Sequence, residues 1–477
     1  MAERENGPDV EEILHTAAEL RHRDDGFHDQ LMAAIYSEAE RVSAASVSAG
    51  PPSRTHQIQR TLDQLLTHRI WAFPFMILGL TSVFWITIEG ANVPSGLLGS
   101  LLLDTVHPWL LGVFASIQAP GWLTGVLVDG VYLATAWVVS VMLPPMAIFF
   151  PLFTLLEDAG YLPRVAFNLD RLFQRVGADG KQALTMSMGF GCNAAGVIAT
   201  RIIHSPRERL IAILTNNFAL CNGRWPTHIV IATIFIGALA PPALAGLVSA
   251  ITVVSMALLG VFLTFAVSWA LSRTLLKGEG SFYALELPPY RPPNVLRTLY
   301  TSVIDRTVFV LGRAVMFSAP AGAVLWTLSN IRVGELSLIQ HLAQGLDPVG
   351  VLIGLNGLVL VAYLVAIPAN EIVVPTILML TVMSLGASSV GQGAGVMVEL
   401  ESGTAVRDLL TQGGWTTLTA LNFLVFSLVH NPCSTTLYTI WKETKSAKWT
   451  AVSGLLPSVL GFALCFVIAQ AWRFLVG

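Results

Sequence analysis

Long stretches without charge restrict this chain more than any other feature. Residues 225–272 contain no Asp, Glu, Lys or Arg, and no Lys or Arg lies between Arg69 and Arg164. A helix needs about 20 apolar residues to cross the hydrocarbon core of a bilayer. Residues 225–272 are therefore long enough to cross twice, with a turn at the Pro-Pro pair 241–242. The pattern predicts an all-α polytopic membrane protein with about seven or eight transmembrane helices.

Composition supports the same class. Only 12% of the 477 residues are charged, against about 25% in soluble domains. A disordered chain, a nucleic-acid-binding protein and an ordinary soluble enzyme are therefore excluded as first hypotheses. The predicted spans are 70–90, 131–156, 209–236, 242–272, 308–331, 350–384, 413–440 and 449–474.

The first 69 residues form a polar arm of different character. They hold 7 Lys and Arg and 12 Asp and Glu. We expect helices over 9–45 and 55–69, joined by a linker at 43–53. No signal peptide is predicted, so the first span is expected to act as its own insertion signal.

Basic residues in the loops predict the orientation. The flank before the first span and the loop 157–181 carry several Lys and Arg, whereas 91–130 carries none. By the positive-inside rule, the N-terminus lies in the cytoplasm of a cytoplasmic (inner) membrane protein. The apolar stretch 182–200 has basic residues on both sides and is predicted to be re-entrant from the cytoplasmic side.

The second half leaves two interpretations. Residues 385–412 look external and 442–448 look cytoplasmic, which requires 350–384 to be re-entrant from outside, with a break near Pro368. Two re-entrant segments that enter the membrane from opposite sides are typical of transporters with inverted repeats. A simple count of eight spans is the alternative.

Polar residues within the apolar body gather in four short segments. They read GFGCNAAG (189–196), NNFALCNGRWP (216–226), IPANEIVVP (367–375) and HNPCSTT (430–436). A polar group at membrane depth is costly and often functional. Glycine and proline in the same segments predict helix breaks. The expected hinges are Gly189, Gly191, Pro226, Pro368 and Pro432.

Three of the four cysteines lie at these breaks. Thiolate and carbonyl ligands together suit borderline cations such as Fe(II) or Zn(II). Simple apolar packing is the alternative for a membrane cysteine, and Cys465 fits it. Glu371 must be paired, protonated or metal-bound at such depth. The predicted metal ligands are Cys192, Asn193, Asn217, Cys221, Glu371 and Cys433, and the predicted proton or metal relay is His228, His430 and Asn370.

In this order, the segments resemble the membrane domain of the FeoB ferrous-iron transporter family, also described as a nucleoside-recognition or Gate family. LEDAGYLPRVAF (156–167), ELPPYRPP (286–293) and NPCSTTLYTIWKETKSAKW (431–449) are similar to further family motifs. The resemblance implies two Gate repeats that contain re-entrant or broken helices. The implied divisions are an arm (1–69), a first span with an external amphipathic segment (70–130), a first Gate repeat (131–275), a cytoplasmic joint (276–307) and a second Gate repeat (308–477).

Departures from the family pattern affect the expected cargo. The family's GTP-binding domain is not expected here, because GADGKQ (177–182) is only an imitation of a P-loop and no nucleotide site is predicted. Asn370 stands where the family has a gate lysine. His430 stands at a position near the second gate cysteine that is tyrosine-like in the family. Fe(II), Zn(II) and Mn(II) all remain candidates.

The expected function is transport of a divalent metal cation, driven by an ion or proton gradient, and no enzymatic activity is expected. The alternatives are a transporter of a small nucleoside-like solute and a membrane subunit that docks a separate GTPase. The expected partners are membrane lipid and the transported metal ion. A homo-oligomer is left open, and no nucleic acid is expected at a net charge of −3.

Overall fold

The computed structural model describes residues 16, 27–46, 54–68, 70–278, 290, 294–385 and 403–476. Two compact units are formed, one by 1–64 with 281–286 and the other by the remaining residues. The first contains helix α2 (Phe27–Ser46) and most of α3 (Arg54–Leu66). These confirm the predicted arm helices wherever the two overlap. Residues 9–15 and 17–26 of the first helix, most of the predicted linker, and most of the ELPPYRPP motif lie outside the described residues.

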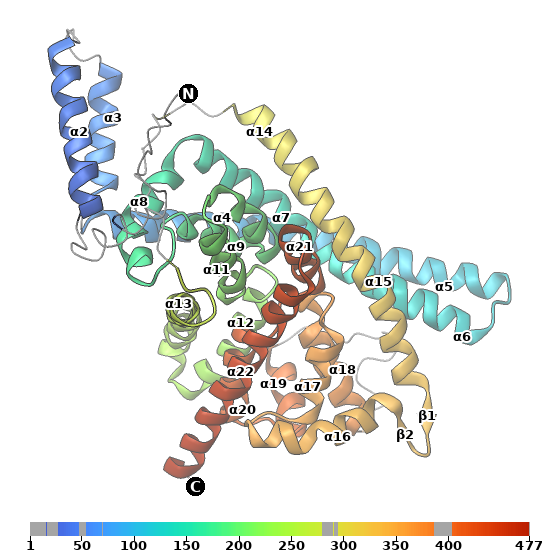
Figure 1. The fold of residues 1–477 in the computed structure, drawn as a ribbon. Coiled ribbons are helices and arrows are strands. Elements are labelled where there is room, and N and C mark those ends of the chain that lie inside the picture. Colours follow the sequence, from blue (N-terminus) through green and yellow to red (C-terminus); the bar gives the residue numbers. More distant parts are fainter. Residues whose placement is uncertain are drawn as a thin grey trace, which may run out of the picture. The chain divides into compact units, whose positions relative to one another are not determined.

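Long apolar helices dominate the second unit and confirm an all-α membrane protein (Figure 1). Five helical runs in the described residues are long and apolar enough to cross a bilayer. Their elements are α4 (Ala72–Gly99), η1 (Ser100–Val106) and α5 (His107–Ser116); α6 (Gly121–Thr124), η2 (Gly125–Tyr132) and α7 (Leu133–Asp158); α13 (Pro242–Arg273); α14 (Val295–Thr301), η7 (Ser302–Val308) and α15 (Phe309–Asn330); and α22 (Ala447–Val476).

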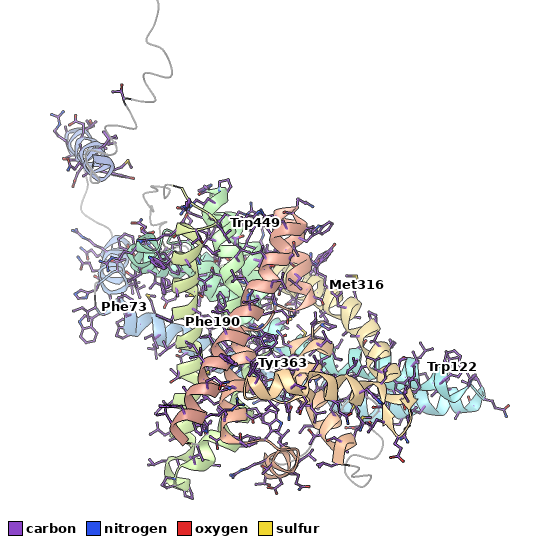
Figure 2. The ribbon with its side chains drawn as sticks, turned by 60° about the horizontal axis from the view of Figure 1, so that its bottom comes forward. Phe73, Trp122, Phe190, Met316, Tyr363 and Trp449 are labelled. Atoms are coloured by element: carbon purple, nitrogen blue, oxygen red, sulfur yellow. The ribbon has the colours of Figure 1, made fainter. Side chains whose placement is uncertain are left out.

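The stretch 91–130, where an external amphipathic segment is expected, is largely helical. It continues the helices on either side of it into a hairpin that turns at 117–120. The π-helical elements η1 and η2 keep the backbone amides paired through this region. His107 Nε2 lies 3.0 Å from Asp129 Oδ1 and joins the two arms of the hairpin. Figure 2 shows Trp122 near the far end of this hairpin, away from the bundle centre.

Three predicted spans are broken helices, so the described residues contain five continuous candidate spans, or six with one bent pair, where about seven or eight helices are predicted. Residues 209–236 form α11 (Pro206–Thr215), η4 (Asn216–Phe218), α12 (Trp225–Ile231) and η5 (Ala232–Ile236), followed by η6 (Gly237–Leu239). Residues 413–440 form α20 (Thr417–Val429) and α21 (Ser434–Thr444). Proline and buried polar groups interrupt both runs, and this outweighs their apolar character.

The third broken span is 350–384. Helices α16 (Leu338–Leu352) and α17 (Gly357–Val365) meet at a bend of 113° and give a sixth crossing if counted as one span. The chain then breaks around Pro368 before η8 (Asn370–Ile372) and α18 (Val373–Leu385). The predicted break is therefore confirmed. Strands β1 (Arg332–Val333) and β2 (Leu336–Ser337) form a small antiparallel hairpin before α16.

The predicted re-entrant stretch 182–200 is also broken. It comprises α9 (Gln182–Gly191) and α10 (Asn193–Ala199), followed by η3 (Thr200–Ile202). At 1.5 Å per residue, α9 reaches only about 15 Å, half of a hydrocarbon core of about 30 Å. The remaining helices are α8 (Tyr161–Arg175) and α19 (Gly403–Gln412).

Buried apolar side chains hold the broken helices together. The largest core cluster joins α17, α18 and α20 and includes Val361, Leu380 and Phe423. Tyr363 is 4% exposed and packs edge-on against Phe426. Figure 2 shows Tyr363 in the middle of the bundle. The broken segments are thus surrounded by protein, as unpaired backbone at membrane depth requires.

Candidate metal site

Four helix breaks meet at one small cavity of about 40 Å³. Cys192, Cys221, Cys433, Asn193 and Glu371 line it. One water needs about 10–15 Å³ of such space. The cavity therefore accepts a cation with few waters and is far smaller than the roughly 300–1,000 Å³ of pockets for organic ligands. Further lining residues are Met142, Met146, Gly191, Asn222, Gly223, Val310, Ala314, Pro368, Ala369, Asn370, Thr435 and Thr436.

The first break of each repeat has nearly the same backbone conformation. Cys192 lies between α9 and α10 with φ −154° and ψ 122°. Ala369 precedes η8 with φ −151° and ψ 124°. A single extended residue within a helical run leaves amide and carbonyl groups without intrahelical partners. Asparagine follows in both repeats, as Asn193 and Asn370.

A backbone hydrogen bond joins the two breaks within each repeat. In the first repeat, the Asn222 N–H donates to the Gly191 carbonyl at 3.2 Å. In the second, the Ser434 N–H donates to the Ile367 carbonyl at 2.8 Å. In each case the donor directly follows a cavity cysteine, Cys221 or Cys433. The backbone therefore positions the thiols as well as the helix ends.

Three glycines near the cavity are closely approached by side chains from other segments. A Cβ added at Gly223 would lie 2.0 Å from Glu371 Oε1. The carboxylate of the second repeat therefore reaches the loop that carries Cys221 in the first. A Cβ at the predicted hinge Gly191 would lie 1.8 Å from Phe149 Cε1. A Cβ added at Gly189, another predicted hinge, would lie 2.7 Å from Asn216 Oδ1.

Three of the four cysteines lie at the cavity, and Cys465 lies elsewhere. Cys192 and Cys433 are partly exposed and Cys221 is buried, all as free thiols. Cys465 is fully buried and donates to the Asn422 carbonyl, which fits a packing role. In the described part of the chain, no three His, Cys, Asp or Glu side chains are already arranged around one metal position. The thiols share a cavity wall without forming a closed cluster.

Three predicted site residues have other contacts. Asn217 does not line the cavity, because its amide donates to the His430 carbonyl at 2.7 Å and accepts from Arg224 at 3.1 Å. This corrects its expected placement among the cavity ligands. The His228 ring lies between the carbonyls of Arg224 (2.9 Å) and Leu424 (3.1 Å). The His430 ring contacts the Ser427 carbonyl and Asn370 Oδ1.

Neither histidine lines the cavity, whereas Asn370 does. His430 Nε2 lies 3.1 Å from Oδ1 of the cavity-lining Asn370. The relay formed by these residues stays a prediction. Among the proposed hinges, Pro226 lies in the first turn of α12, Pro432 immediately precedes Cys433, and Pro368 lines the cavity itself.

Sequence reasoning missed Arg224, which is 1% exposed between the two repeats. A signal was present, because Arg224 is the only Asp, Glu, Lys or Arg between Arg209 and Arg273. An ionisable residue alone in an apolar stretch marks a functional position by default. No sequence signal marks Gly223, because its contact with Glu371 arises only in the folded structure.

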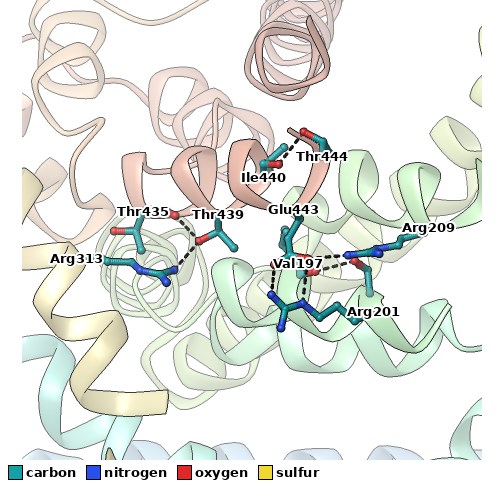
Figure 3. Close-up of polar contacts among 10 residues, drawn as sticks. Val197, Arg201, Arg209, Arg313, Thr435, Thr439, Ile440, Glu443 and Thr444 are labelled. Carbon is teal, nitrogen blue, oxygen red and sulfur yellow. Dashed lines mark hydrogen bonds and ion pairs between the residues drawn. The ribbon is translucent and has the colours of Figure 1, made fainter. Parts of the chain in front are cut away.

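A second polar cluster lies at the far end of α21, the helix that follows Cys433. The Glu443 carboxylate accepts from Arg201 Nε at 3.0 Å and from an Arg209 nitrogen at 2.6 Å (Figure 3). Burial alone would raise the pKa of Glu443. The two guanidinium groups outweigh burial and leave the pKa below its ordinary value. The cluster ties η3 and α11 of the first repeat to α21 of the second.

Comparison with known families agrees with this architecture. The family model described as "Nucleoside recognition" (Gate) matches residues 139–235 and 311–447. A second model, "Ferrous iron transport protein B C terminus", matches 253–306 between those two stretches. The matched stretches contain every residue of the predicted metal site.

Named relatives extend the similarity over most of the chain. An "Fe(2+) transporter FeoB" of Staphylococcus aureus (strain MSSA476) is 29% identical over 86% of this chain and 58% of the relative. One from Synechocystis is 27% identical over 90% of this chain and 66% of the relative.

A fusion of Fe(2+) transport protein A with Fe(2+) transporter FeoB, from Porphyromonas gingivalis, is 26% identical over 85% of this chain and 51% of the relative. The chain thus spans between half and two thirds of the length of these relatives. No solved structure matches. The chain belongs to the FeoB-like Gate family of polytopic membrane proteins.

Proposed function

We propose that this protein carries a divalent transition-metal cation, with Fe²⁺ the first candidate, across the cytoplasmic membrane. The observation that carries the proposal is the cavity shared by three thiols and the Glu371 carboxylate at four helix breaks. Sulfur and oxygen donors together suit borderline divalent cations. The relatives printed as Fe(2+) transporters favour iron.

The cavity size implies partial dehydration of the cargo. A volume of about 40 Å³ leaves little room for a complete hydration shell. Cys192, Cys221 and Cys433 would replace part of that shell, helped by Glu371 and by the Asn193 amide. Because these donors line a wall rather than a closed cluster, the metal is held weakly enough to leave. Movement of the broken helices against each other would open the two sides alternately.

The same volume argues against a nucleoside-like solute, despite the description of the Gate model. Zn²⁺ and Mn²⁺ remain in the proposed cargo class because the donor set is mixed. We further propose that an ion or proton gradient drives transport, with Glu371 as the leading proton carrier, and that the N-terminus is cytoplasmic.

Reconstitution of the full chain into liposomes tests this function. The probe is a trapped metal-sensitive dye, with Fe²⁺, Zn²⁺, Mn²⁺ and Mg²⁺ added in turn, with and without an imposed pH gradient. We expect flux of Fe²⁺ but not of Mg²⁺. Indifference of the flux to the pH gradient would exclude the proton coupling.

Two variants and a matched control assign that flux to the cavity. Cys433→Ala and Glu371→Ala should abolish it while the protein remains folded. Cys465→Ala removes a thiol that lies away from the cavity and should retain it. Wild-type flux in either cavity variant would remove the proposed site.

A further inference from the structure

Arg224 is a buried cation held almost entirely by backbone carbonyls. One terminal nitrogen donates to the carbonyls of Leu428 (2.9 Å) and Asn217 (3.1 Å). The other donates to Asn217 Oδ1 at 3.1 Å, with longer contacts to the carbonyls of Asn431 (3.4 Å) and His430 (3.5 Å). Within the described residues, Arg224 is in none of the ion pairs found.

The acceptors belong to the second breaks of two different repeats. Asn217 lies in η4, four residues before Cys221. Leu428, His430 and Asn431 lie at the end of α20 and in the break that leads to Cys433. A single guanidinium therefore spans the two backbone segments that present these thiols. The Asn217 amide adds a parallel link to the His430 carbonyl at 2.7 Å.

The electrostatic reason is the partial negative charge on carbonyls at a helix end. In discontinuous helices of ion-coupled transporters, unwound carbonyls coordinate Na⁺ or H⁺. Here a tethered guanidinium takes the place of a free ion. Burying a cation is costly unless it is hydrogen-bonded. Both terminal nitrogens of Arg224 are bonded, whereas its buried Nε has no hydrogen-bond partner in the described residues. The terminal nitrogens and the carbonyls therefore hold one another in place.

We infer that Arg224 is a positioning residue that keeps Cys221 and Cys433, from separate repeats, on the same cavity. It does not line the cavity itself. Lysine would retain the charge but not the planar fork that reaches several carbonyls at once. The inference rests on the proposed function for its biological meaning, although its structural content is independent of transport.

Thiol proximity tests the inference without any metal. In a Cys192→Ser, Cys465→Ser background, only Cys221 and Cys433 remain. A bifunctional bimane that fluoresces on joining two thiols should label this protein strongly. Arg224→Met and Arg224→Lys should both reduce the fluorescence several-fold. Arg164→Met is the matched control, because Arg164 is 2% exposed, donates to the Gly160 carbonyl and does not line the cavity.

A spectroscopic measurement on the full chain tests the same point at the metal. Co²⁺ bound by thiolates gives a charge-transfer absorption. Loss of an outer partner of a metal ligand typically weakens affinity about 10- to 100-fold. We expect a loss of this size in Arg224→Lys, and no change in Arg164→Met.

Undiminished bimane labelling and Co²⁺ absorption in both Arg224 variants would overturn the inference. So would unfolding of both variants beside a folded Arg164→Met, since Arg224 would then support the whole bundle. If the wild type moves no metal but the labelling depends on Arg224, the proposed function fails and this inference stands.

Discussion

The first breaks of the two repeats share a backbone and differ in chemistry. Cys192 and Ala369 adopt φ and ψ angles within a few degrees of each other, and asparagine follows both. The residue after that asparagine is Ala194 in the first repeat and Glu371 in the second. One break thus contributes a thiol and the other a carboxylate to the same cavity.

The difference separates the requirements for a break from those for a metal ligand. The break needs one extended residue and a neighbouring segment close to it. Each repeat has such a residue, and in each repeat a backbone hydrogen bond joins the first break to the second. The ligand set needs only side chains that face the cavity, so each repeat is free to supply a different donor. A soft donor and a hard donor in one cavity would suit a borderline cation.

Blocking the contact between the repeats should have the largest effect. Gly223→Ala places a Cβ 2.0 Å from Glu371 Oε1, so we expect the carboxylate to move out of its position in the cavity. We expect metal flux in liposomes to fall roughly a hundredfold, the cost of a displacement of about 1 Å at a reacting centre. Gly246→Ala is the control, because no atom lies within 4 Å of its added Cβ. Normal flux in Gly223→Ala would place Glu371 outside the path.

Making the two breaks alike should have an intermediate effect. Ala369→Cys adds a fourth thiol at the position equivalent to Cys192 in a cavity-lining break. Thiophilic Cd²⁺ should bind roughly tenfold more tightly, a gain of about 1.4 kcal/mol, and flux should slow as release becomes harder. Calorimetric titration and flux measure the two quantities. Ala369→Ser adds no thiol and should leave the Cd²⁺ affinity near that of the wild type. An equal gain in affinity in both variants would show that the added thiol is not the cause.

The ion-pair cluster between the repeats should give the smallest effect. Glu443→Gln removes the charged acceptor of Arg201 and Arg209. The expected loss of folding free energy is only about 1 kcal/mol, because Arg201 is largely exposed and solvent weakens its ion pair. The thermal midpoint should fall at pH 7. Glu38→Gln, at the exposed Arg41 pair of the arm, should leave the midpoint unchanged.

The pH dependence of the same cluster has a defined sign. The folded pKa of Glu443 lies below its unfolded value. Its contribution is therefore complete above the unfolded pKa and is lost as the pH falls through the folded one. The difference in midpoint between wild type and Glu443→Gln should persist from pH 7 to about 5 and shrink below pH 4.5, near the ordinary carboxyl value. A difference that grows on acidification would contradict this assignment.

Much of the candidate site was predictable because helix breaks and the proposed ligands occur together in the sequence. Proline, glycine and polar residues inside apolar runs led to Cys192, Cys221, Cys433 and Glu371, all of which line one cavity. Asn217 was expected there for the same reason. Its side chain instead joins the two repeats, a role that depends on where α20 ends rather than on local sequence.

The number of spans was harder to predict, since hydropathy measures apolar character and not continuity. Residues 209–236 are apolar enough for one span, but their helices are interrupted around Asn217 and Cys221. The stretch 91–130 lacks Lys and Arg and is predicted to be an external amphipathic segment. Its π-helical turns and the contact of His107 with Asp129 keep it helical.

The sequence alone determined the membrane class, the positions of the breaks and the chemistry of the donors, because charge, proline and glycine act locally along the chain. The tertiary structure decided which breaks face one another. It brought Glu371 against Gly223 and buried Arg224 among carbonyls of both repeats. Those contacts join residues far apart in sequence, and only packing in three dimensions creates them.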